Sequence, residues 1–130
     1  MLKKYIYLLI ILLFLIGVCI WEEMSVNVYL QQVDNVVSEI QTVVADREAI
    51  NSYDILLMVE NLEEMWLKNE SNLCVLVNHK DIEDIGMEIA RLKSTIATNQ
   101  IEDFNASLSL VRFFTEAYHH VMGTSFQNLL

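Results

Sequence analysis

Beyond Trp21, apolar and polar positions follow one another with the period of an α-helix. The first apolar stripe runs from Val26 to Val44 in steps of four and three residues, the spacing of one buried helical face. No break lies between Trp21 and Val26, so the pattern predicts one helix that continues out of the preceding apolar run. The stripe consists of Val26, Leu30, Val33, Val37, Ile40 and Val44, and Tyr29, Val36 and Val43 widen it.

Three further stripes predict three more amphipathic helices with short polar connections. Asn51, Asp81 and Asn99 are the predicted N-caps, because each is followed three residues later by an acidic residue. Gly123 is the predicted end of the last helix. The polar patch Asn69–Asn72 is either a solvent-facing turn of a long second helix or a kink. The stripes are Ile55, Val59, Leu62, Trp66, Leu73, Leu76 and Val77; Ile82, Ile85, Ile89, Leu92 and Ile96; and Phe104, Leu108, Val111, Tyr118 and Met122.

The predicted fold is all-α, with one N-terminal transmembrane helix followed by a small antiparallel helical bundle. The chain has no proline and only three glycines, so few positions would break a helix. We expect Trp66 to anchor the core, and an exposed tryptophan at an interface is the alternative. The other predicted core residues are Ile89, Leu92, Phe104, Leu108 and Val111.

The start of the chain has the pattern of a membrane anchor. Tyr5–Trp21 is an uncharged apolar run of 17 residues, roughly 26 Å long as a helix and near the lower limit for a bilayer core. Lys3 and Lys4 precede the run, so the positive-inside rule predicts a cytoplasmic N-terminus. A cleaved signal peptide is the alternative, although residues 17–21 lack a small-x-small cleavage pattern. The predicted divisions are a cytoplasmic stub 1–4, a transmembrane signal anchor 5–21 and an extracytoplasmic bundle 22–130.

Charge content excludes some classes of function, and cysteine content excludes a disulfide within the bundle. All 18 acidic residues lie beyond Trp21, which leaves that part strongly acidic. It therefore lacks the basic patch that a nucleic-acid binder needs, and it is not expected to lie flat on an anionic membrane. Cys74 is the single cysteine beyond the anchor, since Cys19 lies within it, so packing rather than a disulfide must stabilise the bundle.

Four groups of residues are weak candidates for chemistry. Glu116 and His119 have the Glu-x-x-His spacing of di-iron bundles, but those sites need two such pairs and two further glutamates. His79 precedes three acids and could belong to a cation site, or it could simply shape a turn. Cys74, among apolar neighbours, is expected to be a packed cysteine. Glu63-Glu64 is expected on a solvated helical face. We therefore predict no catalytic, cofactor-binding or metal-binding residues.

Several residues on this helical framework match the pattern of a known family. They are Trp21 near the end of the anchor, Trp66, Val77-Asn78-His79, Arg91-Leu92-Lys93 and Asn128-Leu129-Leu130. On these residues the chain resembles, over nearly its whole length, the bacterial domain of unknown function family 4363, a family of small membrane-anchored helical proteins. The resemblance implies a bacterial source, often a spore-forming Gram-positive one, with one anchor and a helical extracytoplasmic domain. The family has no established activity and so supplies no catalytic residues.

We expect a non-enzymatic protein of the bacterial cell membrane, single-pass, with its C-terminus outside. Its acidic ectodomain would be an interaction or accessory subunit for a membrane or envelope protein. The alternative is a ligand- or ion-sensing ectodomain coupled to a partner through the anchor helix. Only Met1–Lys4 would lie inside, so a sensor would have to signal through a partner's transmembrane helix, which favours the subunit. The expected partners are the membrane and a protein but no nucleic acid, and the sequence leaves the oligomeric state open.

Overall fold

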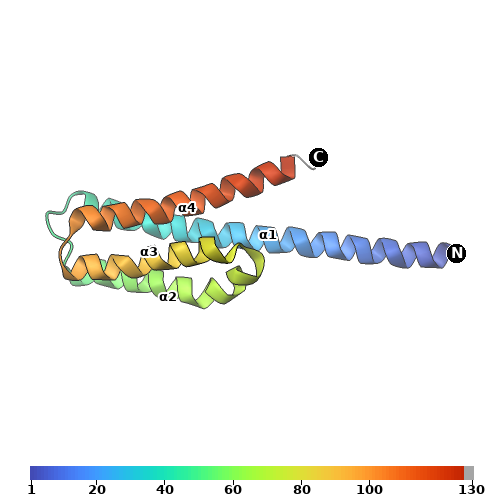
Figure 1. The fold of residues 1–130 in the computed structure, drawn as a ribbon, viewed down its shortest axis with the longest axis horizontal. Coiled ribbons are helices and arrows are strands. Elements are labelled where there is room, and N and C mark those ends of the chain that lie inside the picture. Colours follow the sequence, from blue (N-terminus) through green and yellow to red (C-terminus); the bar gives the residue numbers. More distant parts are fainter. Residues whose placement is uncertain (128–130) are drawn as a thin grey trace.

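The computed structural model describes the backbone of residues 1–127 and the side chains of residues 1–118 and of residue 120. Over this part of the chain the fold is all-α, as predicted, and four helices follow one another with short connections (Figure 1). They are α1 (Leu2–Ala45), α2 (Tyr53–Leu76), α3 (His79–Ala97) and α4 (Ile101–Gln127).

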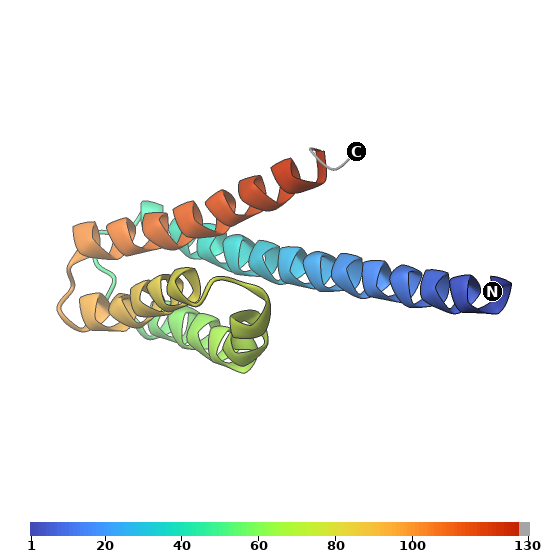
Figure 2. The ribbon, with the colours of Figure 1, turned by 45° about the vertical axis from the view of Figure 1, so that its right-hand side comes forward.

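Helix α1 is continuous from the apolar run into the bundle, which confirms the prediction that no break follows Trp21. Its N-terminal half stands clear of the other helices, and its C-terminal half packs against them (Figures 1 and 2). Nearly all the apolar side chains of the first half are exposed, whereas the stripe from Val26 to Val44 is buried. One helix thus carries two apolar surfaces, of which only the second is covered by this chain.

The bundle closes as a ring of four neighbours. α1 packs on α2, α2 on α3, α3 on α4, and α4 returns to α1, with each helix antiparallel to the next (Figures 1 and 2). The stripes all point to the centre, where burying them removes apolar surface from water. The six predicted core residues lie there with 0–1% of their surface exposed: Trp66, Ile89, Leu92, Phe104, Leu108 and Val111.

Helix α2 runs without interruption through the polar patch Asn69–Asn72, which settles the alternative that the sequence left open. The Asn69 side chain is satisfied within this helix, because its Nδ2 donates a hydrogen bond to the carbonyl oxygen of Met65 at 3.1 Å. Leu73, one turn after Asn69, returns to the core. The polar patch therefore belongs to the solvent-facing side of one long helix.

Two predicted N-caps are wrong by one to three residues. The cap of α2 is Ser52 rather than Asn51, and the Ser52 hydroxyl accepts a hydrogen bond from Arg47 instead of capping the helix. The cap of α3 is Asn78 rather than Asp81, because the Asn78 Oδ1 accepts from the backbone N–H of Lys80 at 3.2 Å. Asp81 lies in the first turn, where its charge favours the positive end of the helix dipole.

Asn99, the third predicted N-cap, ends α3 instead of starting α4. It has a φ of 52°, in the left-handed region, directly after the C-cap Thr98. The N–H groups of Asn99 and Gln100 donate to the carbonyls of Ile96 and Thr95, which is the hydrogen-bond pattern of a Schellman motif. The Asn99 Oδ1 also accepts from the N–H of Ile50 at 2.9 Å, tying this turn to the α1–α2 loop.

The predicted end of the last helix at Gly123 is also wrong, because the backbone of α4 is helical to Gln127. Glycine lowers helix stability by only about 1 kcal/mol relative to alanine, so one glycine does not terminate a helix. Met122 of the predicted fourth stripe lies beyond the described side chains.

Gly86 of α3 lets the indole ring of Trp66 approach the α3 backbone. A Cβ atom at position 86 would lie 3.0 Å from Trp66 Nε1. We therefore expect Gly86→Val to lower the free energy of unfolding by about 1–3 kcal/mol through overpacking. Chemical denaturation followed by circular dichroism measures this loss. Ala90→Val, at an exposed position one turn later, is the matched control, and equal losses from the two variants would contradict the close approach.

Candidate functional site

A polar and aromatic cluster joins α1 to α2 in the half of the bundle nearer the exposed part of α1. The Tyr29 hydroxyl donates to the carbonyl oxygen of Met65 at 2.7 Å, and the rings of Tyr29 and Trp66 have centroids 6.3 Å apart. The same carbonyl accepts from Asn69. Trp66 Nε1 is buried without a hydrogen-bond partner among the described residues. The cluster fixes α2 against α1 close to the point where α1 leaves the bundle.

Burial raises the pKa of Tyr29 from 10.0 to about 12, with the nearby charge of Glu70 adding to the increase. The neutral hydroxyl is the form that donates to Met65, so the folded state holds its proton more tightly than the unfolded chain does. This contribution to stability is fully present below pH 10 and is lost as the pH rises through 12.

We therefore expect the wild-type protein to lose stability relative to Tyr29→Phe between pH 10 and 12. The relative loss should reach about 2–3 kcal/mol when the titration is complete. Urea unfolding of both proteins across this range measures it. Parallel pH dependences would show that Tyr29 ionises as readily in the folded protein as in the unfolded chain.

A second polar contact joins α4 to α1. Arg112 Nε donates to Asp34 at 3.0 Å, and its Nη1 donates to Gln41 at 3.3 Å. Glu116, one turn later on α4, lies 3.6 Å from the same Nε. Because Arg112 contacts two turns of α1, it sets the register between the first and last helices.

A third polar contact links α2 to α3 and corrects the prediction for Glu63. Glu63 is half-buried rather than on a solvated face, and it accepts a hydrogen bond from Lys93 Nζ at 2.8 Å. This hydrogen bond raises the pKa of Lys93 above its usual range. Glu64 is exposed and pairs with Lys68 on its own helix. Partly exposed pairs of this kind contribute little to stability, so they orient helices more than they stabilise them.

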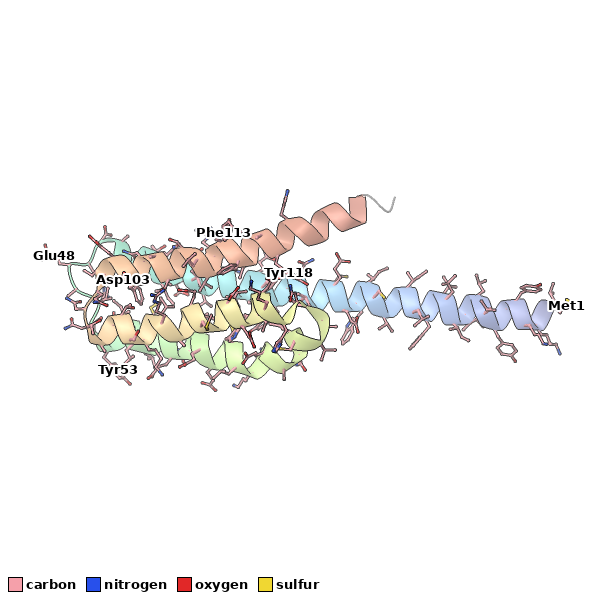
Figure 3. All side chains as sticks on the ribbon, viewed as in Figure 1. Met1, Glu48, Tyr53, Asp103, Phe113 and Tyr118 are labelled. Atoms are coloured by element: carbon pink, nitrogen blue, oxygen red, sulfur yellow. The ribbon has the colours of Figure 1, made fainter. Side chains whose placement is uncertain are left out.

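The loop between α1 and α2 is held by Arg47. Its guanidinium donates to Asp54 and to Ser52, and it holds the pKa of the Asp54 carboxyl well below its usual range. Glu48 and Tyr53 of this region lie at the end of the bundle remote from Met1, together with Asp103 (Figure 3). The end of the bundle remote from Met1 is therefore polar, and the Arg47 side chain holds its α1–α2 loop in place.

The weak candidates from the sequence lie as follows. His79 pairs with Glu83 of its own helix at 3.0 Å, with both side chains largely exposed. Glu116 is exposed beside Arg112, and the side chain of His119 lies outside the described residues. Cys74 is partly buried and packs against the core. Within the described part of the chain, no three His, Cys, Asp or Glu side chains form a group that could hold a metal ion.

Among the described residues, three shallow grooves lie between helices. One of about 400 Å³ lies between α1 and the end of α2, and Trp21, Tyr29 and Val75 are among its walls. A second of about 330 Å³ lies between α1, α3 and α4, beside Tyr118 (Figure 3). The third, also about 330 Å³, lies over Trp66 and Gly86 between α2 and α3. The walls of these grooves combine side chains from the helix stripes with polar and acidic side chains, and such shallow grooves suit contact with another surface more than chemistry on a substrate.

Sequence reasoning missed the residues that join one helix to another. Arg112 interrupts the apolar pattern of α4, and this basic residue within a stripe was the available signal. Its partner Asp34 lies 78 positions away, so the pair can be recognised only when α4 is known to pack on α1. The hydrogen bond that the Tyr29 hydroxyl donates cannot be recognised from the sequence either, because its acceptor is a backbone carbonyl, which carries no sequence signal.

Comparison with curated proteins and with solved structures gives no significant match. Comparison with protein families does give one, and it covers residues 20–129, which is nearly all of the predicted bundle together with the last two residues of the apolar run. The chain therefore belongs to the family described as domain of unknown function DUF4363.

Proposed function

We propose that this protein is a membrane-anchored accessory subunit whose helical bundle binds a protein partner in the membrane or envelope. The observation that carries the proposal is the continuity of α1. Among the described residues, α1 is long and apolar enough to cross a membrane, and none of its most apolar window is buried by the rest of the chain. The same helix supplies a wall of the bundle, so the anchor and the bundle form one rod.

The orientation follows from the charges beside the anchor. Lys3 and Lys4 precede the apolar run and favour the cytoplasm, while Glu22 and Glu23 follow it. The bundle then lies on the extracytoplasmic side of a bacterial cell membrane, with the anchor retained. Protease added to intact spheroplasts should remove a tag fused to the C-terminus. A protected tag, or a mature N-terminus beyond Trp21, would contradict this orientation.

A rigid connection to the anchor supports a subunit more than a free enzyme. A bundle on a continuous helix is held at a fixed height and orientation, which helps it to meet one face of a neighbouring membrane protein. Exposed apolar side chains on the bundle, including Phe113 on α4, offer contact area for such a neighbour (Figure 3). The contacts between helices described above supply a stiff scaffold for it.

The test compares three forms of the protein in native membranes after crosslinking. The first is the natural chain, the second has an unrelated single-pass segment in place of residues 5–21, and the third has an unrelated four-helix bundle in place of residues 26–127. The proposal predicts one partner shared by the first two forms and absent from the third. A partner that crosslinks to the first and third forms, which share the natural anchor, would contradict the proposal. The absence of any partner that depends on the bundle would also contradict it.

A further inference from the structure

The end of the bundle nearest the apolar run carries exposed apolar side chains from two different helices. They are Trp21 and Met24 of α1 and Val75 of α2, and we call these three residues the collar. Val75 is 82% exposed, Trp21 is 70% exposed and Met24 is 63% exposed, so this chain leaves all three uncovered. Both views show the α2–α3 turn beside α1 at the level where α1 leaves the bundle (Figures 1 and 2).

Trp21 determines the height of the collar relative to the membrane. This residue ends the apolar run, and it also lines the groove of about 400 Å³ whose opposite wall includes Val75 and Leu76. Tryptophan at the end of a membrane span prefers the headgroup region, which extends about 5–7 Å beyond each side of the hydrocarbon core. Met24 lies about 4.5 Å further along the helix and remains within that zone. Val75 shares the groove with Trp21 and so lies at a similar level.

The chemistry of the groove matches a bilayer interface. Apolar walls from Trp21 and Leu76 stand beside the carboxylate of Glu22 and polar side chains from Ser25, Asn69 and Asn72. Such a mixture suits the headgroup and glycerol region, where apolar and hydrogen-bonding groups meet. The acidic surface of the bundle, which includes Glu22 in this groove, disfavours broad contact with anionic lipid, so the proposed contact is limited to the apolar side chains at this end.

We propose that the collar rests in the headgroup region of the membrane that α1 spans, so that the end of α2 is a second, peripheral membrane contact. The inference rests on the proposed membrane anchor. It goes beyond that anchor by assigning Val75 and the α1–α2 groove to lipid and not to a protein partner. Two contacts on different helices would resist tilting of the bundle about the point where α1 leaves the membrane.

The experiment uses the full chain in nanodiscs that contain no other protein. In a Cys19→Ala, Cys74→Ala background, a single cysteine carries an environment-sensitive fluorophore at position 75, 67 or 13. Leu67 is the matched control, because it is an exposed apolar residue on the same helix, two turns further from the collar. Leu13 lies in the middle of the apolar run and reports on the anchor. Lipids with a quencher near the headgroup or deep in the acyl chain supply the readout.

The expected result is a blue shift at position 75 and loss of most of its emission with the shallow quencher. Position 67 should keep its emission, and position 13 should lose it with the deep quencher. If position 75 behaves like position 67 while position 13 is quenched, the anchor stands but the collar does not contact the headgroup region, which overturns the inference. If position 13 is not quenched, the proposed anchor fails and the inference fails with it.

Discussion

Replacing Trp66 with alanine is expected to lower the free energy of unfolding by about 3–5 kcal/mol, which is a large fraction of the stability of a small domain. Trp66 is the largest of the fully buried side chains, at 1% exposure. It packs against the Tyr29 ring and lies close to the Gly86 backbone, so its removal leaves a cavity that three helices border. Urea unfolding of the full chain in detergent, followed by circular dichroism, measures the loss.

Two further variants separate packing from other effects. Leu67→Ala, at the next position of α2 and 60% exposed, should change stability by less than about 1 kcal/mol. Trp66→Phe should cost less than Trp66→Ala, because it keeps an aromatic ring and removes a buried N–H that has no described partner. If Trp66→Ala unfolds no more easily than Leu67→Ala, the tryptophan is not the centre of the core.

Two arginines in the middle of the apolar run, Ile10→Arg with Leu13→Arg, are expected to release the protein from the membrane. Each arginine near the centre of a span costs about 2.5–3.5 kcal/mol, so the pair costs about 5–7 kcal/mol. The twelve Leu, Ile, Phe and Val residues of the run together favour insertion by only about 4–7 kcal/mol. The measurement is the fraction of the protein that sediments with membranes after washing with carbonate.

The matched control places the same two arginines on the bundle, at Tyr53 and Leu57. Both positions are exposed on α2, and Tyr53 lies at the end remote from Met1 (Figure 3). This control should remain with the membranes, because neither position lies in the anchor. If the double substitution in the run leaves the sedimenting fraction unchanged, membrane association does not depend on this segment.

The helices and their buried faces could be predicted because each face repeats at helical spacing. The stripe from Val26 to Val44 is an example, since burial of one face requires apolar residues at steps of three and four whatever the face packs against. The continuity of α1 followed from the absence of any break after Trp21. These features depend on local sequence alone.

The helix ends were harder to predict, because several polar side chains in each loop compete for the same backbone groups. Asn99 has the side chain of an N-cap, yet its backbone closes α3 in a left-handed conformation and its amide oxygen binds Ile50 in another loop. Ser52 and Asn51 compete in the same way, and Arg47 determines what the Ser52 hydroxyl binds. Such choices are settled by residues that are distant in sequence or in another element.

Contacts between helices were beyond prediction for the same reason. The Arg112–Asp34 and Lys93–Glu63 pairs join residues that no local pattern relates. The partly buried position of Glu63 depends on α3 lying beside it, whereas its own helix gives no sign of a partner. The collar likewise becomes visible only when the end of α2 is placed beside Trp21.

The most direct test of the central claim is the distance between the anchor and the far end of α1. Spin labels at positions 13 and 42, both exposed, are separated by 29 residues of one helix. With Cys19 and Cys74 replaced by alanine, pulsed electron paramagnetic resonance in nanodiscs should give one narrow distribution near roughly 44 Å. A broad distribution, or a main population at a clearly shorter distance, would show a hinge near Trp21 and contradict a rigid rod that holds the bundle at a fixed height.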